Sequence, residues 1–363
     1  EYLRPASSAI REFAPFNTFY AEGHKLRVSQ IDVGSRARPL LEQWRLCPQC
    51  HHAARVVDET APLSGCPRCD SPRYLDQGQR RWMVHFRQAW SAMDLMEAST
   101  ADDTEERDSE SYTMAELIDF EPEDQRGGWL VENEELVFGY ELFARIRLRE
   151  LNLGPLGDRG DPLDLAGRAF APRGFVVCRD CGKVQPRRPR PGSPQTEHAP
   201  YCRVRTSPRA REELETVFLH RELRSEAIRL VLPVSNHRFE RLLPTASAAL
   251  QLGLRRKLHG QVPHLRITTA TEAVDGVQRH FLVIYDTVPG GTGTLAELVR
   301  GDPVQGCGLI EVMELALAHL RSCSCVEQEG VDGCYRCLFA YQAAHELPNL
   351  SRRTAVELLE RLL

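Results

Sequence analysis

The sequence predicts an α+β protein of several modules, in which small β-rich modules precede a mixed α/β domain at the C-terminus. Three observations predict this class. Cysteines recur in close pairs, short alternating apolar runs with glycine turns fill the first 210 residues, and strand-like and helix-like runs alternate after them. A chain of 363 residues can bury more than one core, so we expect modules at 1–96, 127–210 and 211–363, with a linker at 97–126.

The first module combines a predicted hairpin with a metal-ligand pattern. Strand-like residues at 17–20 and 25–31 flank an Ala-Glu-Gly-His turn. Further along, the spacing C-x2-C-x15-C-x2-C is formed by Cys47, Cys50, Cys66 and Cys69. Two such pairs at hairpin tips bring four sulfurs around one ion, which is the arrangement of a zinc ribbon. We expect His51 and His52 to be solvated neighbours of the first pair and not ligands.

Residues 97–126 are rich in Asp, Glu, Ser and Thr and poor in large apolar residues. Such a segment cannot bury enough surface to offset its ordering entropy, so the sequence predicts an acidic linker or loop. The segment GGWLVENEELVFG at 127–139 then predicts a β-hairpin. A stretch rich in Gly, Pro and Asp at 154–164 predicts a connector that closes this part of the module.

A second metal candidate lies in the module 127–210. A short strand at 175–177 leads into the pattern C-x2-C-x16-H-x3-C, formed by Cys178, Cys181, His198 and Cys202. Three thiolates and one imidazole are a ligand set of structural zinc sites. Between these ligands, the segment PRRPRP carries Arg187, Arg188 and Arg190. A stiff basic loop of this kind either contacts the phosphates of DNA or is a solvated surface loop.

In the last module, strands are predicted at 227–233, 264–270 and 278–286, and helices at 240–259, 294–299, 306–321 and after Ser351. A third cysteine group follows, formed by Cys323, Cys325, Cys334 and Cys337. Its C-x-C and C-x2-C halves suit a closed zinc knuckle, with a disulfide or a pair of free thiols as the alternative. About three zinc ions are therefore expected. Cys307, which stands outside these groups, is expected to be a small apolar residue near a helix start.

The turn TVPGGTG lies between a predicted strand and a predicted helix of the last module. Backbone amides at such a turn can approach an anion closely, and the helix dipole adds partial positive charge. Gly290, Gly291 and Thr292 are therefore candidates for contact with a phosphate or the DNA backbone. The alternative is a structural turn that packs Asp286 and Thr294 against the adjacent cysteine knuckle.

The composition limits the cellular compartments and the binding partners expected for this chain. It contains no run of about 18 apolar residues and no secretion signal, so we expect no membrane span and a soluble, cytoplasmic protein. All the cysteines but one fall into groups with metal-ligand spacing, which indicates a reducing compartment. The formal net charge of −5 does not exclude DNA binding, because local basic segments are what contact phosphates.

The sequence contains no recognisable catalytic motif. It lacks the Walker A pattern G-x4-G-K-[ST] and a DExH box. It also lacks a G-x-S-x-G elbow, an H-E-x-x-H motif and a convincing acidic nuclease cluster. A catalytic zinc needs an open coordination position, whereas the three predicted sites are fully ligated by protein. We therefore expect no catalysis from this chain by itself.

Several motifs of the chain occur together in one known family. They are DTVPGGTG at 286–293, CSC at 323–325, CYRCL at 334–338 and Tyr341, then RSEAIRLVLPV at 224–234 and AALQLGLRRKLHG at 248–260, and more weakly residues 10–28. This set resembles the MZB domain, the mitomycin-repair-factor zinc-binding domain. That domain lies at the C-terminus of superfamily 2 DEAD/DEAH-box helicases, including phage-defence helicases, and in a helicase-associated subunit of the DISARM system.

The resemblance implies a zinc-binding, DNA-engaging accessory region of an ATP-dependent DNA helicase. The helicase motor would be fused before this chain or act beside it, and only the motor would use ATP and Mg²⁺. A start at Glu1 and not at Met fits a segment of a longer protein. The chain would grip DNA through basic residues, namely Arg187, Arg188, Arg190, Arg255, Arg256 and Lys257. The setting would be DNA repair or defence against phage, the latter with other defence proteins as partners.

Two other functional classes stay open on the sequence. A protein-binding scaffold that docks a nuclease or a methyltransferase would use the zinc sites and the acidic linker without touching DNA. An enzyme in its own right, such as a nuclease, would need a metal-dependent active site, and no motif supplies one.

Overall fold

The computed structural model describes most of the chain, and the figures draw the remaining residues in grey. The residues outside the description are 1, 22–23, 58–62, 94–109, 133–136, 188–195, 233–238, 261, 275–276, 302–305, 329, 341 and 343–346. The described part is a mixed sheet-and-helix protein, which confirms the predicted fold class. None of its helices is long and apolar enough to cross a membrane.

The chain forms two compact units that alternate along the sequence. The first comprises Glu1–Leu117 and Arg149–Glu222, and the second comprises Ile118–Leu148 and Leu223–Leu363. The boundaries between the units fall inside three strands of the described residues, namely β9 (Tyr112–Phe120), β11 (Val137–Pro155) and β15 (Leu214–Val231). The consecutive modules expected from the sequence are therefore not the units that the structure shows.

The first unit is built mainly from strands. After α1 (Ala6–Glu12), a three-stranded antiparallel sheet consists of β1 (Thr18–Ala21), β2 (His24–Ile31) and β8 (Ala89–Met93). The strand β5 (Leu41–Leu46) pairs with both β6 (Ala53–Arg55) and β7 (Arg80–His85). Two short hairpins are formed by β3 (Gly34–Ser35) with β4 (Arg38–Pro39) and by β12 (Arg159–Leu165) with β13 (Arg168–Pro172). The predicted N-terminal hairpin is confirmed, although its turn residues 22–23 lie outside the described residues.

Alternating side chains of β15 separate two apolar clusters in the first unit. β15 pairs in parallel with β7 and antiparallel with β14 (Phe175–Cys178), the strand predicted before the second cysteine group. Successive strand residues point to opposite faces. Val217 and Leu219 accordingly join one cluster, whereas Phe218 joins the other.

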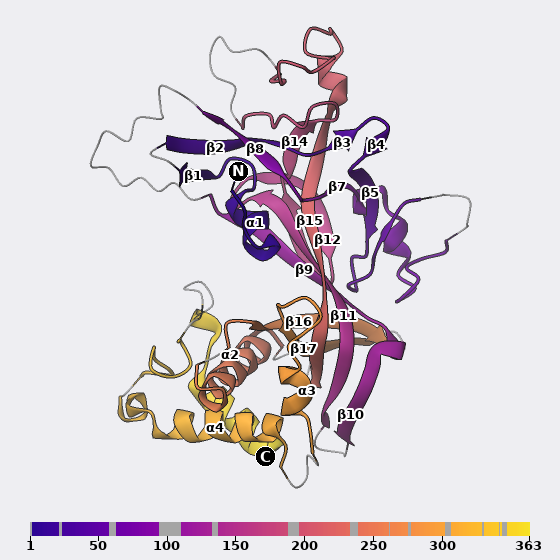
Figure 1. Cartoon of the computed structure of the whole chain (residues 1–363). Coiled ribbons are helices and arrows are strands. Elements are labelled where there is room, and N and C mark those ends of the chain that lie inside the picture. The colour runs from indigo at the N-terminus through magenta and orange to yellow at the C-terminus, as the bar shows by residue number, and fades with distance from the viewer. Residues whose placement is uncertain are drawn as a thin grey trace. The chain divides into compact units, whose positions relative to one another are not determined.

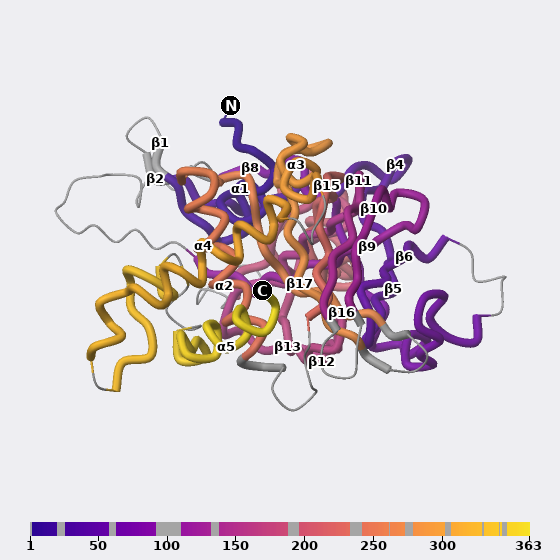
Figure 2. The backbone as a smooth tube through the Cα atoms, turned by 90° about the horizontal axis from the view of Figure 1, so that it is seen from below, coloured from indigo at the N-terminus to yellow at the C-terminus, as the bar shows by residue number. Residues whose placement is uncertain are grey.

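The second unit is a sheet with helices. The strand β10 (Gln125–Glu132) forms a hairpin with β11. The strand β16 (Leu265–Val274) pairs with β17 (Val277–Asp286), and β17 also pairs with β15. The helices of this unit are α2 (Phe239–Lys257), α3 (Thr294–Leu298), α4 (Gly308–Ser322) and α5 (Arg352–Leu362). Figures 1 and 2 both show α2 beside α4, and these two helices are in direct contact. The predicted alternation of strands and helices is confirmed here.

Two apolar clusters lie in this second unit. Ile228 and Leu230 of β15 belong to the cluster that contains the buried side chains of the helices. Leu309, Val312 and Leu320 of α4 contribute to it from one helical face, as their spacing requires. The predicted cap of the last helix is also present, because the Ser351 hydroxyl accepts a hydrogen bond from the Thr354 amide at 3.1 Å.

Two expectations about loops are wrong. Residues 112–120, inside the predicted acidic linker, form β9, with Leu117, Ile118 and Phe120 buried; residues 97–109 lie outside the described residues. The predicted connector at 154–164 instead contains the end of β11 and most of β12. In both places strand pairing decides the structure, since β9 pairs with β11 and β12 pairs with β13. Local composition does not report such pairing partners.

Candidate metal centres and nucleic-acid surface

The first cysteine group is held by a knuckle between β5 and β6. The Cys47 amide donates to the His52 carbonyl at 2.9 Å, and the Cys66 amide closes a second turn by donating to the Ser71 carbonyl at 3.0 Å. These turns bring the Sγ atoms of Cys47 and Cys69 to 3.5 Å, and those of Cys50 and Cys66 to 3.7 Å. Backbone amides of Gln49 and Cys50 point at the Cys47 sulfur.

The second group forms where β14 ends. The Gly182 amide donates to the Cys178 carbonyl at 2.8 Å, which closes the turn between the first two cysteines. The Sγ atoms of Cys178 and Cys202 are 3.8 Å apart, and Nδ1 of His198 lies 3.4 Å from the Cys202 sulfur. The imidazole predicted from the sequence therefore lies with the three thiols as a fourth donor.

The third group lies at the end of α4. Cys323 is the C-cap of that helix, Cys325 lies in the short 3-10 helix Ser324–Glu327, and the Cys337 amide closes the last turn on the Cys334 carbonyl. Neighbouring sulfurs are 3.5–3.7 Å apart. Burial opposes ionisation of Cys334, but the Arg336 amide and the neighbouring thiols lower the pKa of the Cys334 thiol to about 7.

The geometry of all three groups fits a tetrahedral zinc ion. In each, four donor atoms lie within 4.8 Å of one another. A zinc ion with Zn–S bonds of about 2.3 Å has sulfur pairs roughly 3.8 Å apart, close to the separations found here. All these cysteines are free, and their sulfurs are too distant for an S–S bond of about 2.05 Å. The disulfide alternative for the third group is thus wrong.

Residues near the ligands partly follow the sequence-based expectations. Cys307 is buried in the helix-packed core and is the N-cap of α4, as expected. His51 differs, since it is buried and not solvated. Burial, with a contribution from Arg68, lowers the pKa of His51 to about 4. His52 is half-buried against the ring of Tyr74, and neither histidine joins the four sulfurs.

The donors of the glycine turn are hydrogen-bonded to the side chain of Asp286 and to backbone carbonyls. Asp286 is fully buried, and one carboxylate oxygen accepts from the amide and the hydroxyl of Thr292 at 2.8 and 2.6 Å. The other oxygen accepts from the Val288 amide at 2.7 Å. The amides of Gly290 and Gly291 bond to backbone carbonyls of Arg224 and Val288. These contacts favour the structural-turn alternative over phosphate contact through Gly290, Gly291 and Thr292.

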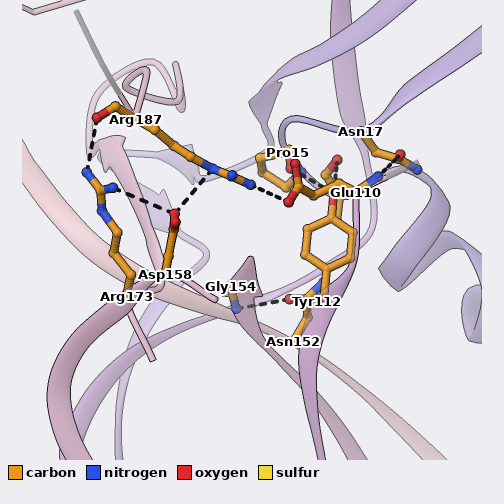
Figure 3. Close-up of polar contacts among 10 residues, drawn as sticks. Pro15, Asn17, Glu110, Tyr112, Asn152, Gly154, Asp158, Arg173 and Arg187 are labelled. Carbon is orange, nitrogen blue, oxygen red and sulfur yellow. Dashed lines mark hydrogen bonds and ion pairs between the residues drawn. The ribbon is translucent and has the colours of Figure 1, made fainter. Parts of the chain in front are cut away.

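The basic loop begins at an arginine that is already paired. Arg187 forms ion pairs with Glu110 at 2.5 Å and with Asp158 at 3.3 Å (Figure 3). Its guanidinium also lies over the ring of Phe16. Asp158 also pairs with Arg173. The side chain of Arg187 is thus only 29% exposed and its charge is already paired, and phosphate contact through it stays a prediction from the sequence. Arg188 and Arg190 lie outside the described residues.

Only some of the basic side chains at the end of α2 are exposed for contact with a phosphate. Lys257 forms an ion pair with Glu311 of α4, so its charge is locally neutralised. Arg255 is half-buried and takes part in other contacts. Arg256 is exposed, and its guanidinium donates to Nδ1 of His319. Of the three predicted residues, Arg256 is therefore the one best placed to meet a phosphate.

Sequence reasoning missed two features of interest. His220 is buried between the rings of His85 and Trp44, at centroid distances of 5.2 and 5.3 Å. No motif signals it, because β7 brings His85 alongside from more than a hundred residues away. Tyr335 is 72% exposed in the middle of the third cysteine group. Its position inside the C-x2-C turn was a signal that could have identified it.

Comparison with protein families gives a match in the C-terminal part of the chain. Residues 246–338 match the family model of MZB, described as the MrfA Zn-binding domain, which confirms the predicted resemblance over these residues. A comparison with curated proteins finds no match. A crystal structure of the DUF1998 helicase MrfA bound to DNA is similar with a TM-score of 0.43 and 11% identity. The similarity covers 98% of this chain, which spans 31% of the MrfA chain.

Proposed function

We propose that this chain is a zinc-stabilised, DNA-engaging accessory region of a superfamily 2 ATP-dependent DNA helicase. The match of residues 246–338 to the MrfA Zn-binding domain carries the proposal. MrfA itself is a helicase and has been crystallised with DNA. As part of the proposal we extend contact with DNA to this chain, and we assign the helicase activity to the motor. The motor, with its ATP and Mg²⁺, acts in cis or in trans, in DNA repair or in defence against phage.

Each cysteine group holds one structural zinc ion in this proposal. Four protein donors fill a tetrahedral ion and leave no position for water or substrate, so the metal organises the local fold. The ligands are Cys47, Cys50, Cys66 and Cys69, then Cys178, Cys181, His198 and Cys202, then Cys323, Cys325, Cys334 and Cys337. Backbone amides aimed at the sulfurs of Cys47 and Cys334 support this assignment, since they favour the thiolate form that binds zinc.

Contact with DNA comes from exposed cations and not from the glycine turn. Arg256 is exposed at the end of α2, and Arg336 is exposed in the third cysteine group. Arg188 and Arg190 belong to the proposal on their sequence alone. Each phosphate neutralised by such a residue releases counterions, so binding weakens as salt rises.

The test is DNA binding by the purified chain, with zinc measured on the same sample. Fluorescence anisotropy compares single-stranded, duplex and forked DNA over a salt series. We expect about three zinc ions per chain, as the cysteine groups require, and an affinity that falls steeply with salt. ATP hydrolysis is expected only when the motor is present.

Two results would contradict the proposal. If zinc is present but no DNA binds at low salt, the chain is better explained as a scaffold that docks a protein partner. DNA cleavage by the isolated chain with Mg²⁺ or Mn²⁺ would instead show an enzyme. Arg256→Glu should weaken binding, whereas Arg126→Glu, which changes an exposed arginine of β10, serves as the control.

A further inference from the structure

The third cysteine group presents an aromatic ring to solvent. Tyr335 lies between the ligands Cys334 and Cys337, and 72% of its surface is exposed. It makes a T-shaped contact with Phe339, with 6.1 Å between the ring centroids and 81° between the ring planes. Because most of the Tyr335 side chain is exposed, ring surface remains open to a stacking partner. Cys334 and Cys337 both belong to the third cysteine group, so the exposed side chain lies in a short turn whose two ends are held in place.

Two exposed arginines are connected to the turn that carries this ring. Arg336 follows Tyr335 and is exposed. Its carbonyl oxygen accepts a hydrogen bond from Nε2 of His319, on the last turn of α4, at 2.8 Å. With that proton on Nε2, Nδ1 is an acceptor and takes a hydrogen bond from the Arg256 guanidinium. His319 thus connects Arg256 of α2 to the backbone of the cysteine turn.

This surface combines the two elements that single-stranded nucleic acid requires. An open aromatic face stacks with any unpaired base, and guanidinium groups bind the adjacent phosphates. Duplex DNA offers no base face to such a ring, because its bases are stacked on one another. An acidic peptide would use the cations but would leave the ring without a partner.

We propose that Tyr335, Arg336 and Arg256 form a stacking platform on which one unpaired base of single-stranded DNA rests, with its flanking phosphates on the two arginines. The inference rests on the proposed function and specifies the form of DNA that this surface takes. His319 is a positioning residue, since it holds the Arg256 guanidinium beside the turn and does not itself touch the strand.

Removing the ring should lower the part of the affinity that depends on the bases and should leave the contacts with the phosphates unchanged. Tyr335→Ala should lower the affinity for oligo(dT) by roughly 5- to 150-fold, the range that base–aromatic stacking supports. Tyr335→Phe should keep most of the affinity, because the phenyl ring still stacks. Arg336→Ala and Arg256→Ala should lower the affinity for any single strand and reduce the salt slope by about one each.

The experiment measures anisotropy of a labelled oligo(dT) and of an abasic strand of equal length, which keeps the phosphates and lacks the bases. The full chain is used, and zinc per chain is determined for every variant. Tyr201→Ala is the matched control, because Tyr201 is 70% exposed and precedes a ligand of the second cysteine group. We expect Tyr335→Ala to lose affinity for oligo(dT) but not for the abasic strand, with zinc content unchanged.

Other outcomes separate this inference from the proposed function. If the wild-type chain binds oligo(dT) and Tyr335→Ala behaves like Tyr201→Ala, the platform is wrong while DNA engagement stands. If Tyr335→Ala loses the same affinity for oligo(dT) and for the abasic strand, stacking is also wrong, because the side chain would then contact only the sugar–phosphate backbone. If the wild-type chain binds neither strand at low salt, DNA engagement itself fails.

Discussion

At the scale of single residues, Asp286 explains how the glycine turn keeps its form without a ligand. The carboxylate accepts hydrogen bonds from the Val288 amide and from both donors of Thr292, so these groups are already satisfied within the chain. A buried carboxylate with three such donors is a stable local structure. The turn therefore belongs to the folding of the second unit.

Two neighbouring glycines test this structural reading of the turn. Gly290 and Gly291 both have positive φ, 85° and 79°, so alanine at either is strained. A Cβ on Gly291 would lie 2.6 Å from Cγ of the buried Glu226, whereas a Cβ on Gly290 meets nothing within 4 Å. We expect Gly290→Ala to cost about 1 kcal/mol and Gly291→Ala about 3 kcal/mol of unfolding free energy. Urea unfolding of both variants measures the difference, and equal costs would contradict it.

His220 gives the folded protein a dependence on pH. The side chain is 3% exposed, and neither ring nitrogen has a hydrogen-bond partner among the described residues. Burial, followed by the proximity of His85, lowers the pKa of His220 to about 3, against about 6.5 when unfolded. The folded state thus binds fewer protons, so its stability is complete above pH 6.5 and falls as the pH drops towards 3.

Replacing this histidine should remove part of the pH dependence. At pH 5 protonation of His220 in the unfolded chain costs the folded state about 2 kcal/mol. His220→Phe keeps an aromatic ring beside Trp44 and cannot be protonated, so its stability should fall less between pH 7.5 and pH 5. Urea midpoints at both pH values for wild type and variant measure this. The same loss in the two proteins would show that His220 does not titrate as inferred.

At the scale of elements, the cysteine groups are short turns whose order depends on their sulfurs. The turn at Cys334–Cys337 has few apolar contacts of its own beyond Leu338 and Phe339, which pack on the helix core. Structural zinc supplies on the order of 10 kcal/mol of folding free energy to such a site. Loss of one ligand should therefore release the ion and unfold the turn, while the other two groups keep theirs.

A pair of cysteine variants tests this dependence. Cys337→Ser should lower the zinc content from about three ions per chain to about two, because serine is a poor zinc ligand. Cys307→Ser is the control, since Cys307 is buried at the N-cap of α4 and lies outside the three groups. Elemental analysis gives the metal content, and thermal unfolding gives the stability. Three ions retained in Cys337→Ser would exclude that residue as a ligand.

At the scale of the whole molecule, each unit is assembled from separate parts of the chain. Residues 118–148 supply β10 and the first part of β11 to the second unit. Phe138 and Tyr140 pack in the helix-covered core, and Phe120 and Phe143 pack in the second apolar cluster of this unit. The C-terminal module expected at 211–363 therefore lacks part of its own core.

Fragments of the chain test this organisation. A fragment of residues 211–363 should be poorly soluble and lack a cooperative unfolding transition, because apolar faces of β15 and β17 are left uncovered. Joining residues 118–148 to 223–363 through a flexible linker should restore cooperative unfolding. Near-ultraviolet circular dichroism during heating distinguishes the two. Cooperative unfolding of the 211–363 fragment, with no gain from the added strands, would contradict the division into these units.

The sequence by itself determined the features that depend on neighbouring residues. The cysteine pairs could be read from their spacing, because a C-x2-C turn is local and two turns are enough to define a site. The helices after residue 239 and the Ser351 cap were predictable for the same reason, since helical periodicity and capping act within a few residues. The resemblance to the MZB domain also rests on such local motifs.

Only the tertiary structure decided which polar groups remain available. Arg187 and Arg256 look alike in sequence, yet Glu110 and Asp158 neutralise the first while the second stays exposed. β9 and the buried His220 likewise depend on strands distant in sequence, β11 and β7. Strand pairing and ion pairing join residues that are far apart along the chain, so local composition carries no record of them.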